Sequence, residues 1–586
     1  MKSLLGNDRI WRPARPKQGL VDSIREDFNC SRVFAGIVAS RYGEDYDRAN
    51  LLTGEGEELP DGVFHSSDAL PDLSSAIDRI VLAAREEQDV FIHGDFDVDG
   101  LSSAAIVYRG LKNLKDLPGP GKLKVDVGSR DFGHGISKKV SSRLIDEGYD
   151  LVITTDCGVK GNDEIAHLKN FGIDVIVTDH HEPSNNLPPA LAVVDPKRED
   201  SDYPNPHLAG AGVAYKLVES LVDRVDGNSE RKSDLIQLAA LGTVSDLVPL
   251  IVEGEDENRW LVKAGLEEMR QNPITGISAL LGELGGKRKE VRPEIVSYRI
   301  APKLNSANRV GDPQVSFLLL ATRNRARAEH LAGTLIDYDR DRSRLQDKLT
   351  RKAITQVKEA GFDPETDGLV FVVGDEWNPG ILGLVSSRLS GKFNLPAVTI
   401  SRNTPTCRGS MRGIEGMSVY EGLSRCSDYL TKFGGHEMAG GFAVDSSNLD
   451  PLRNCLQDWA SSELESYEAV EENPLEDKLN PAQVNLNLYR EIQKLAPFGM
   501  GNPKPYFWMD QLDIVSARRV GSSKNHLKLK LAGGDEILDC IGFGMGEDLP
   551  RLKEQSRVNP VFTLELNDWG GRESVQLKLE DFVLKE

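Results

Sequence analysis

Five short apolar segments between Val90 and Val194 constrain the fold of this chain more than any other feature. Because helical stretches join these β-branched runs, we expect an α/β domain with a mostly parallel sheet. Ligands of such sheets bind at the carboxyl ends of the strands, where the acidic and histidine residues of these segments stand. The segments are VFIHGDFD (90–97), KLKVDV (122–127), DLVITTDCG (150–158), DVIVTDHH (174–181) and ALAVVDP (190–196).

The first segment leads into an acidic cluster, HGDFDVDG, in which His93, Asp95, Asp97 and Asp99 stand two residues apart. On a strand, alternate residues share a face, so these side chains can converge on one point. Carboxylates so close together repel one another unless cations neutralise them, which predicts a metal site. Taken alone, the motif also fits an Asp-rich surface turn or a calcium loop. An EF-hand is disfavoured because no Glu stands at its twelfth position and an apolar strand precedes it.

Three further motifs supply candidate metal ligands. A single histidine is usually structural, but adjacent histidines after a strand-end aspartate are uncommon outside metal sites. The combined set holds enough oxygen and nitrogen ligands for two cations, and its carboxylate majority favours Mn²⁺ or Mg²⁺. Two such ions can clamp and hydrolyse a phosphoester. The residues are Asp156 in TTDCG (154–158), Asp179, His180 and His181 in VTDHHEP (177–183), and Asp246 in LGTVSDLVPL (241–250).

The remainder of the chain is predicted to hold a connector, a second α/β lobe and a β-barrel. Residues 315–360 are crowded with charge pairs and are expected to form one long exposed helix between two lobes. The second α/β segment runs from Leu369 to about Cys455, and the acidic stretch 465–478 is expected to be a linker. Short alternating strands between 505 and 584 indicate a small barrel, with the OB-fold as the leading candidate.

Charge and composition restrict the partners of the chain. The net charge of −21 argues against broad adhesion to nucleic acid, so any contact with DNA must be local or made through metal ions. No long apolar run occurs, and the first fifteen residues lack the apolar core of a signal peptide, so a cytoplasmic protein without membrane association is expected. The six cysteines are scattered, without a C-x-x-C pair, and free thiols in a reducing compartment are expected.

The DHH triplet at 179–181, with DFDVDG before it, resembles the DHH phosphoesterase superfamily. Further segments resemble those of RecJ-like exonucleases, in the same order along the chain. These segments are SRDFGHG (129–135), LAGAGVAYKL (208–217), RIAPKLNSANRVGDP (299–313), FGGHEMAGGF (433–442), PFGMGNPKPYF (497–507) and WGGRESVQLKLED (569–581).

This resemblance implies a multidomain α/β protein with a C-terminal OB-like β-barrel. The further C-terminal domain of some RecJ proteins, implicated there in partner binding, is not expected after the barrel. The expected borders are 1–60 for an N-terminal segment of unclear role, 61–314 for a DHH phosphoesterase domain with a mostly parallel sheet, 315–362 for a connector helix, 363–460 for a DHHA1 α/β domain, and 461–586 for an OB-fold nucleic-acid-binding domain with its preceding linker.

The superfamily pattern also implies a distribution of the metal ligands. One ion would be held by Asp97 and Asp156, with His93 or Asp95 completing its shell. Asp156 would bridge to a second ion, and His181 would face the scissile phosphate as an electrostatic or proton-transfer partner. The implied ligands of the second ion are Asp99, Asp156, His180 and Asp246.

On the nucleic-acid side, the resemblance implies that Arg130, Ser410 and Arg412 recognise a 5′-phosphate end. The alternative for the arginines is an ordinary surface ion pair. Gly434, Gly435 and His436 are candidates for close approach to a phosphate. A loop-like stretch between the lobes is expected to wall a channel for unpaired strands, through Arg299, Lys303, Asn305 and Arg309. About two of five aromatic residues in the barrel are expected to stack on bases, the others being core: Phe507, Trp508, His526, Phe543 and Trp569.

The implied function is 5′→3′ hydrolysis of single-stranded DNA by two-metal catalysis, releasing 5′-mononucleotides in DNA repair and recombination. A monomer is expected, with single-stranded-DNA-binding protein or repair helicases as partners. One alternative is a DHH-family phosphodiesterase acting on short oligonucleotides or RNA, whose relatives resemble only the first two lobes. Another is an inactive, replication-associated DNA-binding scaffold, although such proteins typically lose acidic ligands that this chain retains.

Overall fold

The chain folds into two units, each assembled from segments that are far apart in the sequence. The barrel unit comprises Met1–Val63, Pro249–Asp256 and Ala469–Glu586, and the two-sheet unit comprises Phe64–Val248 and Glu257–Glu468. The domain borders expected from the sequence stay a prediction. The computed structural model describes residues 4–5, 10–44, 62–112, 114, 117–128, 135–225, 229–286, 291–364, 366–402, 405–466, 472–521, 524–553, 557–569 and 572–583.

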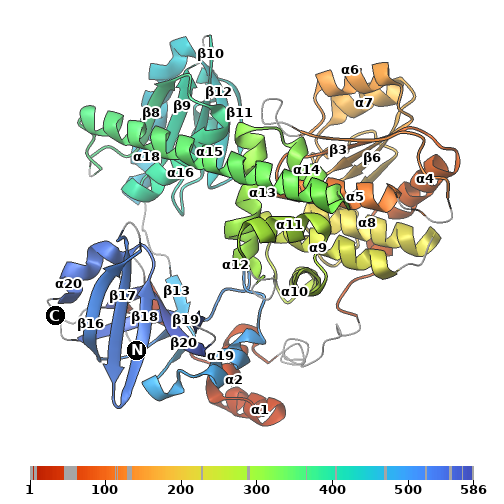
Figure 1. Ribbon diagram of the computed structural model, residues 1–586. Helices are drawn as coiled ribbons and strands as arrows, with labels where there is room; N and C mark the ends of the chain where they lie inside the picture. Colours follow the sequence, from red (N-terminus) through yellow and green to blue (C-terminus); the bar gives the residue numbers. More distant parts are fainter. Residues whose placement is uncertain are drawn as a thin grey trace. The chain divides into compact units, whose positions relative to one another are not determined.

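The parallel sheet of the two-sheet unit has the strand order β4-β3-β5-β6-β7, and every pairing in it is parallel. All residues of β3 and β5 are buried, which explains the apolar run with which each strand begins. The register aligns Gly94, Thr155 and Thr178, so the strands end level with one another. The α/β architecture predicted from the sequence is confirmed (Figure 1). The strands are β3 (Val90–Gly94), β4 (Leu123–Val127), β5 (Leu151–Thr155), β6 (Asp174–Thr178) and β7 (Ala192–Val194).

Helices cover both faces of the parallel sheet (Figure 1). On one face, α6 and α7 bury Leu144, Ile165 and Leu168 against Val152 and Val175 of the sheet. On the other face, α5 runs beneath the strands and packs against α8 and α9. The helices are α4 (Leu73–Arg85), α5 (Val98–Lys112), α6 (Lys138–Glu147), α7 (Asn162–Asn170), α8 (Gly210–Val225), α9 (Ser229–Ser245) and α10 (Glu257–Gln271).

A helical region links this sheet to the second one, and its longest member is α15 (Arg325–Glu359). The single helix expected over 315–360 is interrupted. Helix α14 ends at Ala321, and α15 starts after Asn324, whose side chain accepts the N–H of Arg327. The first half of α15 packs on α11 and α13, and its second half packs on the second sheet. The other helices are α11 (Thr275–Glu283), α12 (Pro293–Ile295), a π-helical turn (Val296–Ile300), α13 (Ala301–Val310) and α14 (Gln314–Ala321).

The mixed sheet of the two-sheet unit has the order β11-β12-β10-β9-β8, in which only β8 and β9 are parallel. Helices α15 and α16 cover one face, and α17 and α18 cover the other. The elements are β8 (Val370–Asp375), α16 (Pro379–Phe393), β9 (Ala397–Arg402), β10 (Thr406–Arg412), α17 (Val419–Arg425), β11 (Leu430–Gly435), β12 (Ala439–Asp445) and α18 (Leu449–Ser466).

The cysteine prediction is wrong for one pair, because Cys426 and Cys455 form a disulfide. Cys426 follows α17 directly and Cys455 lies on α18, and these two helices pack together on the same face of the mixed sheet. Packing between helices, rather than a short sequence spacing, brings the two thiols together. The remaining cysteines are free: Cys30, Cys157, Cys407 and Cys540.

The barrel unit contains a closed five-stranded barrel, which confirms the OB-fold expectation. Strands β16, β17 and β18 form an antiparallel meander, β18 pairs with β20 in parallel, and the β19–β20 and β16–β19 pairings close the circle. Part of the expected linker 465–478 is instead sheet. The strands and helices are β13 (Glu472–Leu475), β14 (Asp477–Lys478), α19 (Leu486–Gln493), β15 (Phe507–Trp508), β16 (Leu512–Val520), β17 (His526–Gly533), β18 (Glu536–Gly542), α20 (Leu549–Lys553), β19 (Arg557–Trp569) and β20 (Arg572–Val583).

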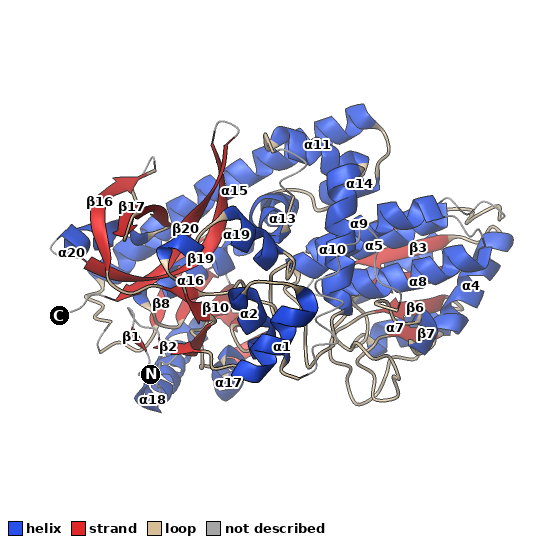
Figure 2. Ribbon diagram, turned by 90° about the horizontal axis from the view of Figure 1, so that it is seen from below, coloured by secondary structure: helices blue, strands red, loops and turns tan. Residues whose placement is uncertain are grey.

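The N-terminal segment is part of the barrel unit, which the sequence did not reveal. Helix α2 lies beside α19 in both views (Figure 1 and Figure 2), and its Phe34 and Ile37 join the core under the barrel. Trp11 donates a hydrogen bond from its indole to Asp581, 570 residues away. No described helix is long and apolar enough to cross a membrane. The N-terminal elements are β1 (Leu4–Leu5), β2 (Ile10–Pro13), α1 (Gln18–Phe28) and α2 (Arg32–Tyr42).

Candidate metal centre and phosphate-binding residues

The acidic residues meet because the strands of the parallel sheet end level with one another. Asp95 follows β3, Asp156 follows β5 and Asp179 follows β6. We expected the side chains of the first cluster to converge because alternate residues of a strand share a face. This expectation is wrong in detail, since β3 ends at Gly94 and does not continue through the motif. Asp97 instead caps α5, accepting the N–H groups of Asp99 and Gly100, and Asp99 lies in the first turn of that helix.

In the described structure, three groups of side chains could each hold a metal ion. Within each group, the ligand atoms lie within 4.8 Å of one another. Asp156 and His180 each belong to two groups, so the groups form one continuous cluster. His93 is in none of them; it is buried, and its Nε2 lies 3.3 Å from the Gly135 carbonyl oxygen. The groups are Asp95, Asp97 and Asp156; Asp99, His180 and Asp246; and Asp156, His180 and His181.

His180 stands among three carboxylates. Its Nε2 lies 3.1 Å from Asp156 Oδ1, and 3.7 Å from an oxygen of both Asp99 and Asp246. Burial, with help from the neighbouring His181, lowers the pKa of His180 to about 3, so the ring is neutral at neutral pH. The contact with Asp156 is not aligned as a hydrogen bond, because Asp156 Oδ1 has no hydrogen-bond partner among the described residues. A ring nitrogen and a carboxylate oxygen that lie this close without a hydrogen bond between them are typical ligands of one shared metal ion.

The carboxylates cannot all ionise without a counter-charge. Burial and then the neighbouring carboxylates raise the pKa values of Asp99 and Asp156 well above the usual range. The same causes raise the pKa of Asp246 to about 7. Raised pKa values at clustered acids mean that protons or cations must occupy the cluster. The oxygen-rich donor set fits divalent Mn²⁺ or Mg²⁺.

Two glycines make room for these carboxylates. A Cβ atom on Gly210 would lie 2.6 Å from Asp156 Oδ1, and one on Gly242 would lie 2.4 Å from Asp99 Oδ1. The N–H groups of Gly210 and Ala211, at the start of α8, also donate to the two carboxylate oxygens of Asp99 at 2.7 and 2.9 Å. Sequence reasoning gave these residues no role, although the glycines of the LAGAG motif, Gly210 among them, are typical of a close backbone approach.

Asp179 holds His181 rather than joining a ligand group. Its Oδ1 accepts from His181 Nδ1 at 2.7 Å and from the backbone N–H of His180, and its Oδ2 accepts from Val159. Burial alone would raise the pKa of Asp179, but the hydrogen bond and charge of His181 lower it. Burial would lower the pKa of His181, but Asp179 and the nearby carboxylates outweigh it and raise that pKa to about 9. His181 is therefore a protonated, partly exposed member of the cluster.

The candidate phosphate-binding residues lie on the mixed sheet. Arg412 Nη1 donates to Ser410 Oγ at 3.1 Å and to the Met411 carbonyl at 2.8 Å. Across the sheet, Ser410 pairs with Gly441, which pairs with Gly434. Gly434 and Gly435 are exposed, and the His436 N–H donates to Ala439 at the hairpin end. Arg130 lies outside the described residues.

The loop-like conformation expected for 299–309 is wrong, because this stretch is helical, while its role as a channel wall stays a prediction. Arg299 lies in the π-helical turn, and α13 carries the other three residues. Pro302 stands in the first turn of α13, where proline starts a helix rather than breaking it. The lysine and arginine side chains of this stretch also have partners in the protein. Lys303 pairs with Asp339 at 2.8 Å, Arg309 donates to the Gly380 carbonyl and Arg299 donates to the Leu284 carbonyl. Asn305 Oδ1 is buried without a hydrogen-bond partner among the described residues.

The stacking candidates of the barrel divide into core and surface. Phe507 and Trp508 are buried. Phe543 is 54% exposed, and its ring lies edge-on to His526 with centroids 5.4 Å apart. The side chain of Trp569 lies outside the described residues. Phe543 and His526 are thus the described aromatic pair available to a ligand on the barrel.

Known proteins resemble the chain over its whole length. Family models match as the DHH family N-terminal domain over residues 89–243, the DHHA1 domain over 365–462 and the RecJ OB domain over 475–581. The single-stranded-DNA-specific exonuclease RecJ of Bacillus subtilis strain 168 is 31% identical over 588 residues, covering 100% of this chain and 72% of the relative. The RecJ of Thermus thermophilus is 32% identical over 503 residues, covering 85% and 69%.

Solved structures give the same result. The crystal structure of Thermus thermophilus RecJ in complex with Mn²⁺ matches with a TM-score of 0.81 at 28% identity, covering 98% of this chain and 80% of that one. The Mg²⁺ complex of the same protein matches with a TM-score of 0.75 at 27% identity, covering 98% and 78%.

Proposed function

This chain belongs to the RecJ family of single-stranded-DNA-specific exonucleases, and from that premise we propose how its own residues perform the reaction. It is a metal-dependent hydrolase that degrades single-stranded DNA from the 5′ end, with Mn²⁺ or Mg²⁺ as cofactor. The observation that carries the proposal is the buried cluster around Asp156 and His180, in which five carboxylates meet and the protonated His181 alone does not balance their negative charge.

Asp156 is the bridging residue of this proposal, because it belongs to groups on both sides of the cluster. Asp95 and Asp97 complete one position, and His93 lies behind it as a buried neighbour. When bound, two divalent cations supply the positive charge and Lewis acidity that phosphodiester hydrolysis requires. The other position would take Asp99, His180 and Asp246 together with the shared Asp156, whose Oδ1 lies 3.1 Å from His180 Nε2.

His181 has a separate task in this proposal. Asp179 fixes its ring through the 2.7 Å hydrogen bond and keeps it protonated at neutral pH. The partly exposed imidazolium can therefore donate a hydrogen bond to the phosphate oxygens as negative charge develops on them. Asp179 is a positioning residue, acting through His181.

End recognition is assigned to Ser410 and Arg412, with Arg130 as the further arginine that the family pattern predicts. The hydrogen bond between Ser410 and Arg412 pre-orients both groups on one face of the mixed sheet. A terminal phosphate binds there, beside the exposed glycines Gly434 and Gly435. The product is a 5′-mononucleotide. We further propose that the chain works as a cytoplasmic monomer in DNA repair and recombination, with single-stranded-DNA-binding protein or repair helicases as partners.

Two other functions are less well supported. A scaffold without catalysis would not need the ligand atoms that this chain retains around Asp156. A phosphodiesterase for short oligonucleotides would not need the RecJ OB domain at 475–581.

The deciding experiment is digestion of single-stranded DNA labelled at either end, in parallel with matched RNA and duplex, in Mn²⁺, Mg²⁺ or chelator. Mononucleotides should be released from the 5′ end of single-stranded DNA only when the metal is present, and Asp156→Asn should release none. Binding without cleavage under every metal would replace this function with the scaffold. Preferential cleavage of short RNA would replace it with the oligonucleotide phosphodiesterase.

A further inference from the structure

The mixed sheet ends in an edge strand, β8, that lies away from the metal cluster residues and the phosphate-binding residues of β10. β8 pairs only with β9, and no other described strand pairs with its second side. The Val370 N–H donates to Pro396 and the Glu376 N–H donates to Arg402, so the even-numbered residues turn their backbone groups toward β9. By the alternation of a parallel strand, the N–H and C=O groups of Phe371 and Val373 point to the open side.

Within β8, Asp375 at its end is the one charged residue of the kind that protects an open edge. Natural sheets blunt an open edge with Lys, Pro, a bulge or a very short strand. β8 is VFVVGD, which has no Lys or Pro, and its pairing with β9 runs over all six residues without a register shift. A weakly protected edge of this kind is a template for a further strand.

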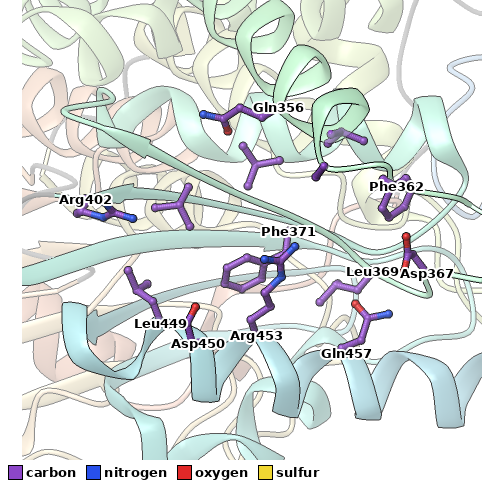
Figure 3. Close-up of a pocket in the computed structure, with 14 residues that line it drawn as sticks. Gln356, Phe362, Asp367, Leu369, Phe371, Arg402, Leu449, Asp450, Arg453 and Gln457 are labelled. Carbon is purple, nitrogen blue, oxygen red and sulfur yellow. The ribbon is translucent and has the colours of Figure 1, made fainter.

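The edge is recessed between two helices (Figure 3). A crevice of about 410 Å³ is lined by Gln356 of α15 on one side, by Asp450, Arg453 and Gln457 of α18 on the other, and by Phe371 of β8. A second crevice of about 500 Å³ continues along β8 past Val373, under Arg351 and Lys352 of α15. A single extended peptide can enter such a groove, whereas the flanking helices keep the edge of another folded sheet away.

The charges of the groove favour an acidic occupant. Arg351, Lys352 and Arg453 are exposed and form no ion pair within the described residues. Arg453 lies over the ring of Phe371, at 5.6 Å from its centroid. One of the three lining carboxylates, Asp375, is paired with Arg402 at 3.6 Å, whereas Asp367 accepts only the backbone N–H of Asp363 and keeps its charge. The three cationic side chains therefore face two carboxylates that have no described ion-pair partner, Asp367 and Asp450, and outnumber them in a chain whose net charge is −21.

We propose that the groove along β8 binds an extended acidic peptide of a partner protein, which adds to the mixed sheet as a sixth strand. The backbone groups of Phe371 and Val373 supply the hydrogen bonds of the new ladder. Alternate side chains of the peptide point toward α15 or α18, so acidic residues on either side meet Arg351 and Lys352 or Arg453. The site leaves the phosphate-binding face of β10 open, so the partner can be held while DNA is degraded.

The test uses the full chain and two fluorescein-labelled peptides of the same length, one alternating valine with glutamate and one alternating valine with lysine. Fluorescence anisotropy should show the acidic peptide binding about tenfold more tightly than the basic one at low salt. Hydrogen–deuterium exchange should show the amides of Phe371 and Val373 slowed on binding. Equal affinity for both peptides, no binding of the acidic peptide up to about 1 mM, or protection elsewhere in the chain would overturn the proposal.

Two variants distinguish the contribution of the backbone hydrogen bonds of β8 to peptide binding from the contribution of the charged side chains. Val373→Pro removes a donor that faces the open side, so it leaves the β9 pairing intact while weakening peptide binding about fivefold or more. Arg453→Glu should weaken binding by a similar factor, about fivefold, whereas Arg425→Glu, an exposed control at the end of α17, should not. Exonuclease activity on bare single-stranded DNA should be unchanged in all three. If neither Val373→Pro nor Arg453→Glu affects binding, the groove is not the site; if the chain dimerises through an edge that Val373→Pro disrupts, the occupant is a second copy.

Discussion

The two sheets of the two-sheet unit both carry residues to which we assign contacts with phosphate, but they hold these residues in opposite ways. The parallel sheet fixes Asp99 and Asp156 in buried positions, with backbone N–H groups on both oxygens of Asp99. The mixed sheet presents Ser410 and Arg412 half-buried beside Gly383 of α16, held by hydrogen bonds to each other and to Met411. The first arrangement is fixed before any ligand arrives, and the second can adjust to one.

This difference predicts all-or-none behaviour at the parallel sheet and graded behaviour at the mixed sheet. Buried like charges are costly unless cations neutralise them, so losing one ligand removes both the ions and the reaction. A half-exposed arginine contributes affinity for one end of the substrate, and its loss leaves the chemistry in place.

The largest expected effect is at Asp156. Asp156→Asn should lower the rate of single-stranded DNA hydrolysis by about a thousandfold or more, because the shared ligand of both positions is lost. The same variant should lose the rise in melting temperature that Mn²⁺ gives the wild type, and it should melt no lower than wild type in chelator, where one repelling charge is gone. Asp163→Asn, an exposed aspartate on α7, is the matched control. Activity within about tenfold of wild type would contradict the bridging role.

A second prediction tests whether the metal centre tolerates a shift of Asp99 when the carboxylate itself is retained. Gly242→Ala places a Cβ 2.4 Å from both Asp99 Oδ1 and the Cβ of Ala211, so Asp99 must move. We expect about a hundredfold loss of activity and a higher Mn²⁺ requirement, measured by titrating the metal in the digestion assay. Gly333→Ala, also inside a helix but with nothing within 4 Å, should keep full activity and gain up to about 1 kcal/mol of stability. Equal activity of the two variants would show that the space around Asp99 can accept an additional methyl group.

The same contrast explains what the sequence could reveal. The parallel sheet could be predicted because its strands are short, apolar and directly followed by the polar residues, so strand ends and candidate ligands are read together from Asp95, Asp156 and His180. The mixed sheet and its helices depend on longer-range packing. The pairing of Cys426 with Cys455 results from the packing of α17 against α18, over a separation of 29 residues.

Two other misses have the same origin. The stretch around Lys303 and Asn305 looked like a loop because Pro302 and Gly311 interrupt it, yet these residues mark the two ends of α13. The N-terminal segment carried no motif because its partners are remote, as the bond between Trp11 and Asp581 shows. Tertiary contacts across hundreds of residues leave no local periodicity to detect.

At the mixed sheet, Arg412→Ala should reduce the preference for a 5′-phosphorylated end by about tenfold while the rate on unphosphorylated DNA changes little. The measurement is competition between 5′-phosphorylated and 5′-hydroxyl single strands of the same sequence. Arg425→Ala, an exposed arginine on the same domain, should keep the preference. A loss of rate on both substrates as severe as that of Asp156→Asn would break the comparison, because the mixed sheet would then belong to the all-or-none part of the site.

The smallest effect is expected on the barrel, where the exposed ring of Phe543 is available for stacking. Phe543→Ala should weaken binding of a long single strand about threefold to tenfold, measured by anisotropy in Ca²⁺ or chelator so that no cleavage occurs. Phe171→Ala is a close match: Phe171 is 61% exposed and lies edge-on to His167 at 5.2 Å, as Phe543 lies edge-on to His526 at 5.4 Å, but it belongs to the two-sheet unit, directly after α7. If both variants bind DNA equally well, exposure of an aromatic ring alone does not make the barrel surface a binding face. If only Phe543→Ala loses affinity, and only for long strands, the barrel contributes affinity that depends on the length of the DNA. The parallel sheet then contributes the chemistry.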